Sequence, residues 1–244
     1  MIAQWPRTIR TAIRYLLLPG ACLACHRLLS ADDDAFCSDC QDLFRVESAW
    51  VCPRCSATVG FGTDVAEGCT SCRGERWCFE RVVRLGPYEG ALRELILRMK
   101  HRSGEDLARA VGERWAAVMA AKLATQRIDV VVPVPMHWRR HWQRGFNVAA
   151  CLAEALAQRL GVPCENGCLR KQRMTRTQSS LSPAERRTNL RGAFTISHGH
   201  RVRGKSVLLV DDVLTTGCTA NEASRLLRDA GAQQIVVAVV ARRR

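Results

Sequence analysis

Two adjacent carboxylates and a short hydroxyl-rich turn near the C-terminus are the residue types needed to bind a sugar phosphate. Asp211 and Asp212 follow the apolar run 207–210, and the turn over 215–219 reads Thr-Thr-Gly-Cys-Thr. The apolar run predicts a buried strand, and residues 221–230 predict a helix. Backbone N–H groups at a helix N-terminus bind anions. We therefore expect the acids to bind vicinal ribose hydroxyls and the turn to bind a 5′-phosphate.

The segment 210–219 resembles the phosphoribosyl pyrophosphate (PRPP) motif of type I phosphoribosyltransferases. The resemblance implies that Asp211 and Asp212 are catalytic acids and that PRPP binds together with Mg²⁺, which neutralises the leaving pyrophosphate. The alternative is an ordinary strand-to-helix turn, which we disfavour because paired carboxylates at a strand end are costly without a ligand or cation. The implied phosphate-binding residues are Val213, Leu214, Thr215, Thr216, Gly217, Cys218 and Thr219.

Eight of the 13 cysteines form four Cys-x-x-Cys pairs within residues 22–72. Each pair can turn two thiolates towards one metal ion, and two pairs complete a tetrahedral zinc site. We predict one or two structural zinc ions, with neighbouring pairs combined or with the pairs cross-braced. Disulfides would need an oxidising compartment, and a redox role would use a single pair, so zinc is favoured over both. The ligands are Cys22, Cys25, Cys37, Cys40, Cys52, Cys55, Cys69 and Cys72.

Positive charge is concentrated between residues 130 and 205, where 14 Lys and Arg stand against three acids in a chain of net charge +14. Such a segment attracts polyanions, including PRPP, pyrophosphate and nucleic acid. Within it, Arg139, Arg140 and Arg144 are interleaved with Trp138 and Trp142. The arginines suit phosphate contacts, and the aromatic side chains suit stacking on single-stranded nucleic acid. Alternatively, the two tryptophans, four residues apart, pack along one face of a helix.

The spacing of apolar residues predicts an α/β fold with a parallel sheet flanked by helices. Expected strands cover 81–88, 128–132, 207–210 and 235–240, and expected helices cover 92–102, 105–122, 148–160 and 221–230. Lys100 closes the first of these helices, where a favourable position at the helix C-terminus and a role in substrate binding are equally compatible. The segment 169–194 is polar and rich in Arg, and we expect a loop with a short helix beginning at Ser182.

The likeness to type I phosphoribosyltransferases implies roles for two of the basic segments. In that family the loop after the strand equivalent to 128–132 contacts pyrophosphate, so Arg139 and Arg140 are expected to face it. A mobile loop covers the site in the interval after residue 169. We expect this loop, or bound nucleic acid, to involve four side chains: Arg144, Arg176, Gln178 and Arg187.

Taken together, these motifs resemble the ComF family, whose members combine a double zinc ribbon with a type I phosphoribosyltransferase-like domain. The matching segments are the Cys-x-x-Cys pairs, Arg-Gly-Phe-Asn at 144–147, the stretch 176–194 and the PRPP motif. The resemblance implies a zinc-ribbon domain with a short N-terminal helix over residues 1–78 and a phosphoribosyltransferase-like domain over 79–244.

It also implies a role in natural competence, in the handling of incoming single-stranded DNA together with recombination proteins. We favour an enzyme over two alternatives: a competence protein that binds nucleic acid without catalysis, and a nucleobase salvage phosphoribosyltransferase. No run of 18 apolar residues is present, which predicts no membrane span and a cytoplasmic protein.

Overall fold

The computed structural model describes residues 20–30, 34–45, 50–173 and 192–243. Its contacts divide the chain into two compact units, Met1–Arg45 and Val46–Arg244. The N-terminal helix and the helix predicted from Ser182 lie outside the described residues. This division follows contacts between residues and does not test where one independently folding domain ends and the next begins. The domain boundary between residues 78 and 79 therefore stays a prediction.

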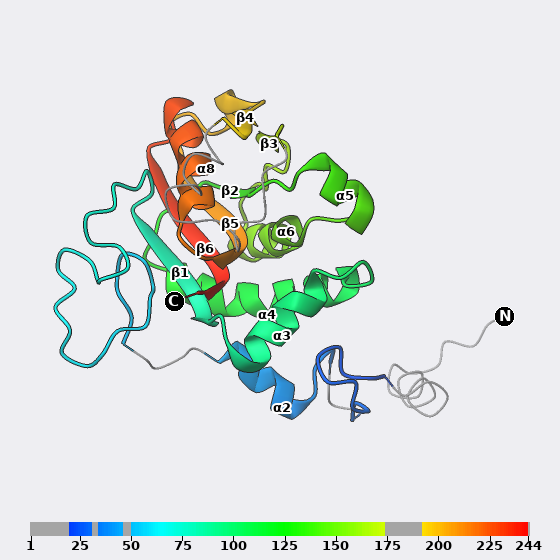
Figure 1. The fold of residues 1–244 in the computed structure, drawn as a ribbon. Coiled ribbons are helices and arrows are strands. Elements are labelled where there is room, and N and C mark those ends of the chain that lie inside the picture. Colours follow the sequence, from blue (N-terminus) through cyan, green and yellow to red (C-terminus); the bar gives the residue numbers. More distant parts are fainter. Residues whose placement is uncertain (1–19, 31–33, 46–49, 174–191, 244) are drawn as a thin grey trace. The chain divides into compact units, whose positions relative to one another are not determined.

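A four-stranded, entirely parallel sheet organises the larger unit (Figure 1). Its order is β1 (Arg81–Pro87), β6 (Gln234–Arg242), β5 (Ser206–Leu214) and β2 (Val130–Pro133). The central strands are near-continuous runs of buried Val, Leu, Ile and Ala, as expected for a sheet covered on both faces. Because parallel strands end at the same edge, the carboxyl ends of all four strands lie together. The predicted α/β fold with a parallel sheet is confirmed.

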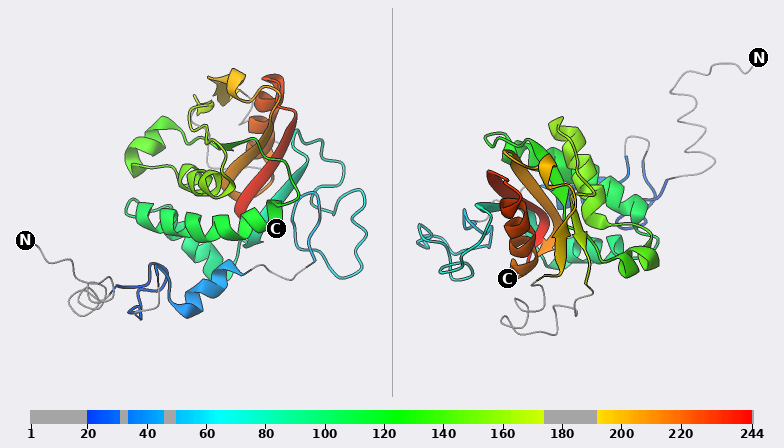
Figure 2. Two further views of the ribbon diagram at one scale, coloured as in Figure 1. Left: turned by 180° about the vertical axis from the view of Figure 1, so that it is seen from behind. Right: turned by 90° about the horizontal axis from the view of Figure 1, so that it is seen from above.

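Helices cover the two faces of this sheet (Figures 1 and 2). On one side lie α3 (Gly90–Met99), α4 (Glu105–Leu123) and α6 (Val148–Leu160), and α8 (Cys218–Asp229) lies on the other. Apolar residues of α8 join alternate residues of the strands in one core cluster. On the opposite face, the fully buried Trp115 of α4 donates its indole N–H to the Val239 carbonyl at 3.3 Å.

A two-stranded antiparallel sheet, β3 (Leu169–Lys171) paired with β4 (Phe194–Ile196), was not predicted. Its strands contain three residues each and contribute Leu169 and Phe194 to buried clusters. The helix predicted over 221–230 begins earlier, at Cys218, because Gly217 adopts a left-handed conformation with a φ of 80° and serves as its N-cap. The described part of this unit also contains α5 (Trp138–Arg144) and the 3₁₀ helix Gly199–Arg201.

Within residues 20–30 and 34–45 of the smaller unit, the helical elements are α2 (Ser38–Gln41) and the 3₁₀ helix Asp42–Phe44. The rings of Phe36 and Phe44 pack with centroids 5.1 Å apart. Few apolar side chains are buried in this described part, so metal binding is an important source of its stability.

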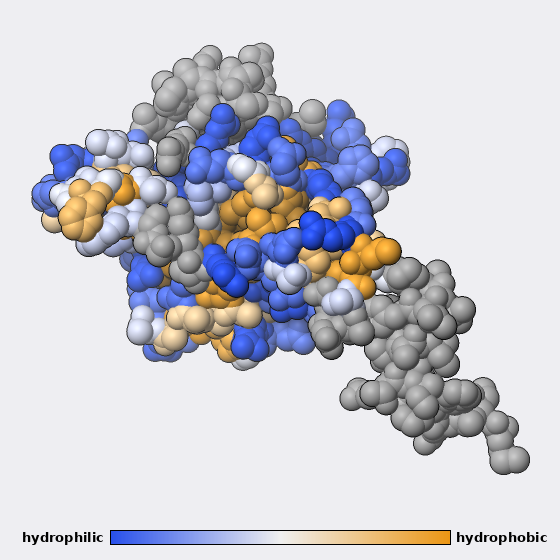
Figure 3. Space-filling view, turned by 90° about the horizontal axis from the view of Figure 1, so that it is seen from below, coloured by the Kyte–Doolittle hydropathy of each residue, from blue (hydrophilic) through white to orange (hydrophobic). Residues whose placement is uncertain are grey.

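Hydrophilic residues predominate on the face of the molecule seen in Figure 3, and hydrophobic residues gather there in smaller patches. Among the described residues, no helix is long and apolar enough to cross a membrane.

Candidate functional site

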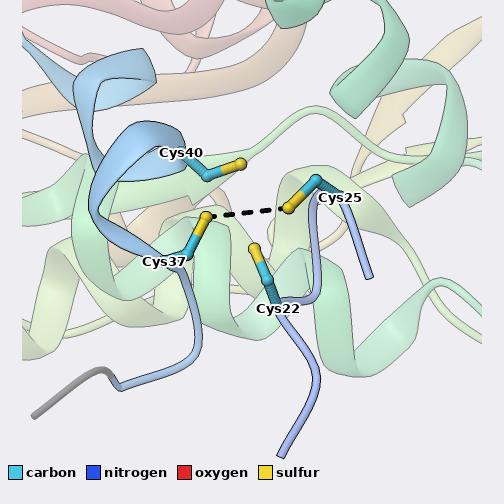
Figure 4. Close-up of side chains that lie close together, drawn as sticks. All are labelled: Cys22, Cys25, Cys37 and Cys40. Atoms are coloured by element: carbon cyan, nitrogen blue, oxygen red, sulfur yellow. Dashed lines mark hydrogen bonds between the residues drawn. The ribbon is translucent and has the colours of Figure 1, made fainter. Parts of the chain in front are cut away.

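The eight predicted ligand cysteines form two clusters, Cys22/25/37/40 and Cys52/55/69/72, in which the sulfur atoms lie within 4.8 Å of one another (Figure 4 shows the first). Neighbouring pairs are thus combined, and the cross-braced alternative is wrong. Tetrahedral coordination with Zn–S bonds of about 2.3 Å places sulfur atoms about 3.8 Å apart. The Cys25–Cys37, Cys52–Cys72 and Cys55–Cys69 separations are 3.6, 3.7 and 3.4 Å. The residues therefore fit zinc, and four protein ligands per site leave no open catalytic position.

The backbone around the first cysteine of each cluster also suits a thiolate. Burial by itself raises the pKa of the Cys52 thiol, but hydrogen bonds from backbone groups of Cys55, Cys69 and Arg54 lower it to about 7. Burial is likewise outweighed at Cys22, where backbone hydrogen bonds lower the pKa to about 6. Because zinc binds the thiolate, Cys22 and Cys52 can each supply one at neutral pH, whereas burial raises the pKa of the Cys55 thiol in the second cluster.

The two acids lie at the carboxyl end of β5, as the PRPP motif predicts. The backbone N–H of Asp212 donates to the Asp211 carboxylate at 2.8 Å. The Asp212 carboxylate forms an ion pair with the ammonium of Lys100 at 3.0 Å. Burial, and then the charge of Asp212, raises the pKa of Asp211 to about 7. The pair therefore carries less than two full negative charges at neutral pH.

The raised pKa of Asp211 predicts a pH-dependent contribution to stability. The folded state binds the Asp211 proton more tightly than the unfolded state, whose Asp pKa is about 3.9. The resulting stabilisation is complete below about pH 4 and is lost as the pH rises through the folded value of about 7. We expect the unfolding free energy of wild type, relative to Asp211→Asn, to fall across this interval. Urea denaturation at a series of pH values measures it, and a constant difference would contradict the assignment.

A cavity of about 180 Å³ opens at these acids. Besides both carboxylates, it is lined by five residues of the predicted phosphate loop: Val213, Leu214, Thr215, Gly217 and Thr219. Thr216 and Cys218 do not line it. The Thr216 hydroxyl is buried and has no partner within the described residues, and Cys218 packs against the cluster of Ala193 and Phe194. The N–H groups of the first turn of α8 have no partners within the helix, so this turn can bind an anion.

Four further residues line the cavity: Tyr88, Ala220 and Arg243 were missed as site residues, and Lys100 was left open between a structural and a substrate-binding role. Lys100 lies just after α3, where its sequence position also fits a helix C-terminus, so only the ion pair with Asp212 distinguishes the two roles. Tyr88 and Arg243 each follow a strand directly. A polar residue immediately after a buried parallel strand was the available signal, and it is the signal that identified Asp211.

The predicted pyrophosphate arginines lie on α5. This helix begins after His137, whose ring accepts a hydrogen bond from the Arg139 N–H at 3.2 Å. The Arg139 guanidinium lies 5.2 Å from the centroid of the Trp138 ring. Neither Arg139 nor Arg140 lines the cavity at the acids, within the described part of the chain. Arg144 at the end of α5 interacts electrostatically with Asp212: burial lowers the pKa of its guanidinium, and the charge of Asp212 opposes that effect.

Trp138 and Trp142 are 61% and 83% exposed, so neither packs into the core. Arg176, Gln178 and Arg187 lie outside the described residues. A larger cavity of about 790 Å³ adjoins α5 and is lined in part by Trp138, Phe146 and Lys171.

Comparison with known proteins agrees with this architecture. Residues 146–244 match the family described as phosphoribosyl transferase domain. Competence protein F of Haemophilus influenzae is 32% identical over 225 residues, which cover 91% of this chain and 96% of that protein. The chain belongs to the ComF family. The DNA utilization protein YhgH of Escherichia coli K12 is also 32% identical over 225 residues, with the same coverage of 91% and 96%. Competence protein ComFC of Streptococcus pneumoniae is 32% identical over 213 residues, covering 85% of this chain and 88% of that protein.

Membership of the ComF family accounts for the order of the chain, with cysteine clusters first and a phosphoribosyltransferase-type domain after them. The family prediction made from the motifs is confirmed.

Proposed function

We propose that this ComF protein binds PRPP, or a related ribose phosphate, with Mg²⁺ at the carboxyl edge of the sheet. One observation carries the proposal: a single cavity combines the paired acids, the cationic side chains of Lys100 and Arg243, and the turn that precedes α8. The two carboxylates can accept hydrogen bonds from the ribose hydroxyls, and the adjoining turn can bind the phosphate. The cavity therefore matches both ends of a ribose phosphate.

Each part of the cavity has a role in this proposal. The Asp211 and Asp212 carboxylates accept hydrogen bonds from the ribose hydroxyls and from Mg²⁺-bound water. The turn over 215–219 and the first turn of α8 bind the 5′-phosphate through backbone N–H groups. When bound, Mg²⁺ supplies positive charge that neutralises the pyrophosphate as it leaves. Transfer of the phosphoribosyl group would then depend on positioning and charge stabilisation, which this site supplies without a protein nucleophile.

Isothermal titration calorimetry of the full chain with PRPP and Mg²⁺ tests the proposal. We expect PRPP to bind most tightly, ribose 5-phosphate more weakly because it lacks the pyrophosphate contacts, and pyrophosphate most weakly because it lacks both the ribose and the 5′-phosphate contacts. Affinities that instead rank by ligand charge, with pyrophosphate above ribose 5-phosphate, would indicate nonspecific attraction of anions to a basic protein and would overturn the proposed site.

We further propose that the protein acts in the cytoplasm on incoming single-stranded DNA, together with recombination proteins. The names of two relatives, competence protein F and DNA utilization protein YhgH, support this role. Helix α5 supports it physically, because two exposed tryptophans flank Arg139 and Arg140 there. Exposed aromatic rings beside arginines suit stacking on unpaired bases with contacts to the phosphates.

Substitutions on α5 are therefore expected to weaken binding of single-stranded DNA. Trp138→Ala and Trp142→Ala should each cost at least about fivefold in affinity, because stacking one base contributes about 1–3 kcal/mol. Arg139→Ala/Arg140→Ala should reduce the slope of log K against log salt by about 1.4, or about 0.7 per phosphate contact. Fluorescence anisotropy of a labelled oligothymidylate at several salt concentrations measures both.

Trp50→Ala is the matched control, since Trp50 is also 61% exposed but lies in the second cysteine region. DNA binding should also survive Asp211→Asn. If it were lost in that variant, DNA and ribose phosphate would share one site.

A further inference from the structure

The second cysteine cluster packs against β1, an edge strand of the sheet. The phosphate loop follows β5 of the same sheet. The backbone N–H of Val82 in β1 donates to the Arg54 carbonyl at 2.9 Å, and the Ser56 hydroxyl donates to the Val82 carbonyl at 2.8 Å. The Arg84 guanidinium donates to the Thr58 hydroxyl at 2.6 Å. Because β1 is an edge strand, residues 54–58 occupy the side where a further strand would pair. The cluster and the sheet belong to one compact unit.

Trp77 connects this cluster to the phosphate loop. It packs against the buried cluster formed by Cys52, Cys55, Ala57, Cys69 and Cys72, and its ring stacks on Phe79 with centroids 4.7 Å apart. The Arg54 guanidinium, from the turn between Cys52 and Cys55, lies 5.0 Å from the Trp77 ring centroid. The same guanidinium donates to the Cys72 carbonyl at 2.8 Å. One arginine thus ties both Cys-x-x-Cys turns of the cluster to the indole.

The other side of the indole meets the loop itself. A Cβ atom placed on Gly217 would lie 3.4 Å from the Trp77 ring, so the ring covers the residue that caps α8. Gly217 has a φ of 80° and caps α8, and it lines the cavity together with Thr219 and Ala220 of the first helical turn. A second connection lies one residue further on, where the Cys78 N–H donates to the Asn221 side chain at 2.7 Å. The Asn221 N–H in turn donates to the Gly217 carbonyl at 2.8 Å.

We propose that Trp77 is a positioning residue for ribose-phosphate binding, through which the metal-bound cluster Cys52/55/69/72 holds Gly217 and the first turn of α8 in their binding conformation. A structural zinc site couples metal binding to local folding, so the ion fixes the segment between Cys72 and Phe79. A loop that is already ordered loses less entropy on binding its ligand. This inference rests on the proposed function for the ligand, but the ordering of the loop has its own readout.

Trp77→Ala and Trp77→Phe, compared with the control Trp50→Ala, test this role in the full chain. We expect Trp77→Ala to keep its zinc, as measured by metal analysis, but to bind PRPP and Mg²⁺ more weakly, within the roughly 5- to 150-fold range of coupled sites. Trp77→Phe should recover most of the affinity because its ring still covers Gly217, and Trp50→Ala should match wild type. Unchanged affinity in Trp77→Ala, or equal losses in the Ala and Phe variants, would overturn the proposal.

Hydrogen–deuterium exchange of the peptide covering 213–221, without ligand, separates this inference from the proposed function. We expect slow exchange in wild type and Trp77→Phe, and faster exchange in Trp77→Ala and in chelator-treated protein. If wild type failed to bind PRPP while the exchange pattern held, the proposed ligand would be wrong and the coupling right. Exchange that does not respond to Trp77→Ala or to zinc removal would overturn the coupling.

Discussion

Replacing Asp211 and Asp212 together with Asn should abolish measurable PRPP binding while the protein stays folded. Hydrogen bonds to charged groups contribute about 1.5–3 kcal/mol each, so losing two amounts to roughly 3–6 kcal/mol, or two to four orders of magnitude in Kd. Asn keeps the shape of Asp, and the raised pKa of Asp211 means that its neutral form is already accommodated. At position 212 the change also removes the ion pair with Lys100, so a thermal melt of the double variant should accompany the titration and show a cooperative transition.

Whether PRPP affinity falls or rises in the double variant distinguishes specific contacts from general electrostatic attraction. PRPP is an anion, so removing two acids from its site would strengthen binding if general electrostatic attraction governed it. A loss of affinity would instead require specific contacts from the carboxylates. Asp106→Asn, at an exposed position in the first turn of α4, is the matched control and should bind as wild type does. Retained or improved binding in the double variant would leave the acids without the assigned role.

The sheet was predictable because each long strand has a local sequence signal, a continuous run of apolar residues. β5 and β6 are continuous apolar runs, and the intervening helix α8 has regular amphipathic spacing. The same locality explains why the acids and the phosphate loop could be found, since they are contiguous over 211–219. Lys100 follows α3 and Arg243 follows β6, so only the packing of that helix and the parallel pairing of β6 with β5 bring them to this cavity.

Other features could not be read from the sequence for physical reasons. Strands β3 and β4 are three residues long, too short for an alternating pattern to stand out from a polar, Arg-rich segment. The pairing of the Cys-x-x-Cys turns was ambiguous because both arrangements satisfy the same spacing. The association of the second cluster with Gly217 depends on Trp77, a single aromatic residue 140 positions away, for which no local pattern exists.

Zinc removal should unfold the cysteine segments within residues 20–75. Around the second cluster, the buried core consists of the four cysteines and Ala57, with only partly buried residues packed against it. So little apolar burial cannot offset the entropy of ordering the chain. Structural zinc contributes about 10–16 kcal/mol in zinc-finger peptides, far more than any other interaction available here. We expect two zinc ions per chain by metal analysis, and loss of protection from hydrogen exchange in these segments after chelation. A metal-free protein with eight titratable ligand thiols and unchanged exchange would contradict the prediction.

The two clusters should also release their metal in order. All four cysteines of Cys52/55/69/72 are buried, whereas Cys25 in the first cluster is exposed and Cys40 is half-buried. A chelator or thiol reagent reaches an exposed sulfur first, so we expect Cys22, Cys25, Cys37 and Cys40 to be modified before the other four. Mass spectrometry of partly alkylated protein measures this order. Since the second cluster is the one joined to the phosphate loop, PRPP affinity should persist through the first loss of zinc and fall with the second. Simultaneous loss of both metals would show that the clusters do not differ in accessibility.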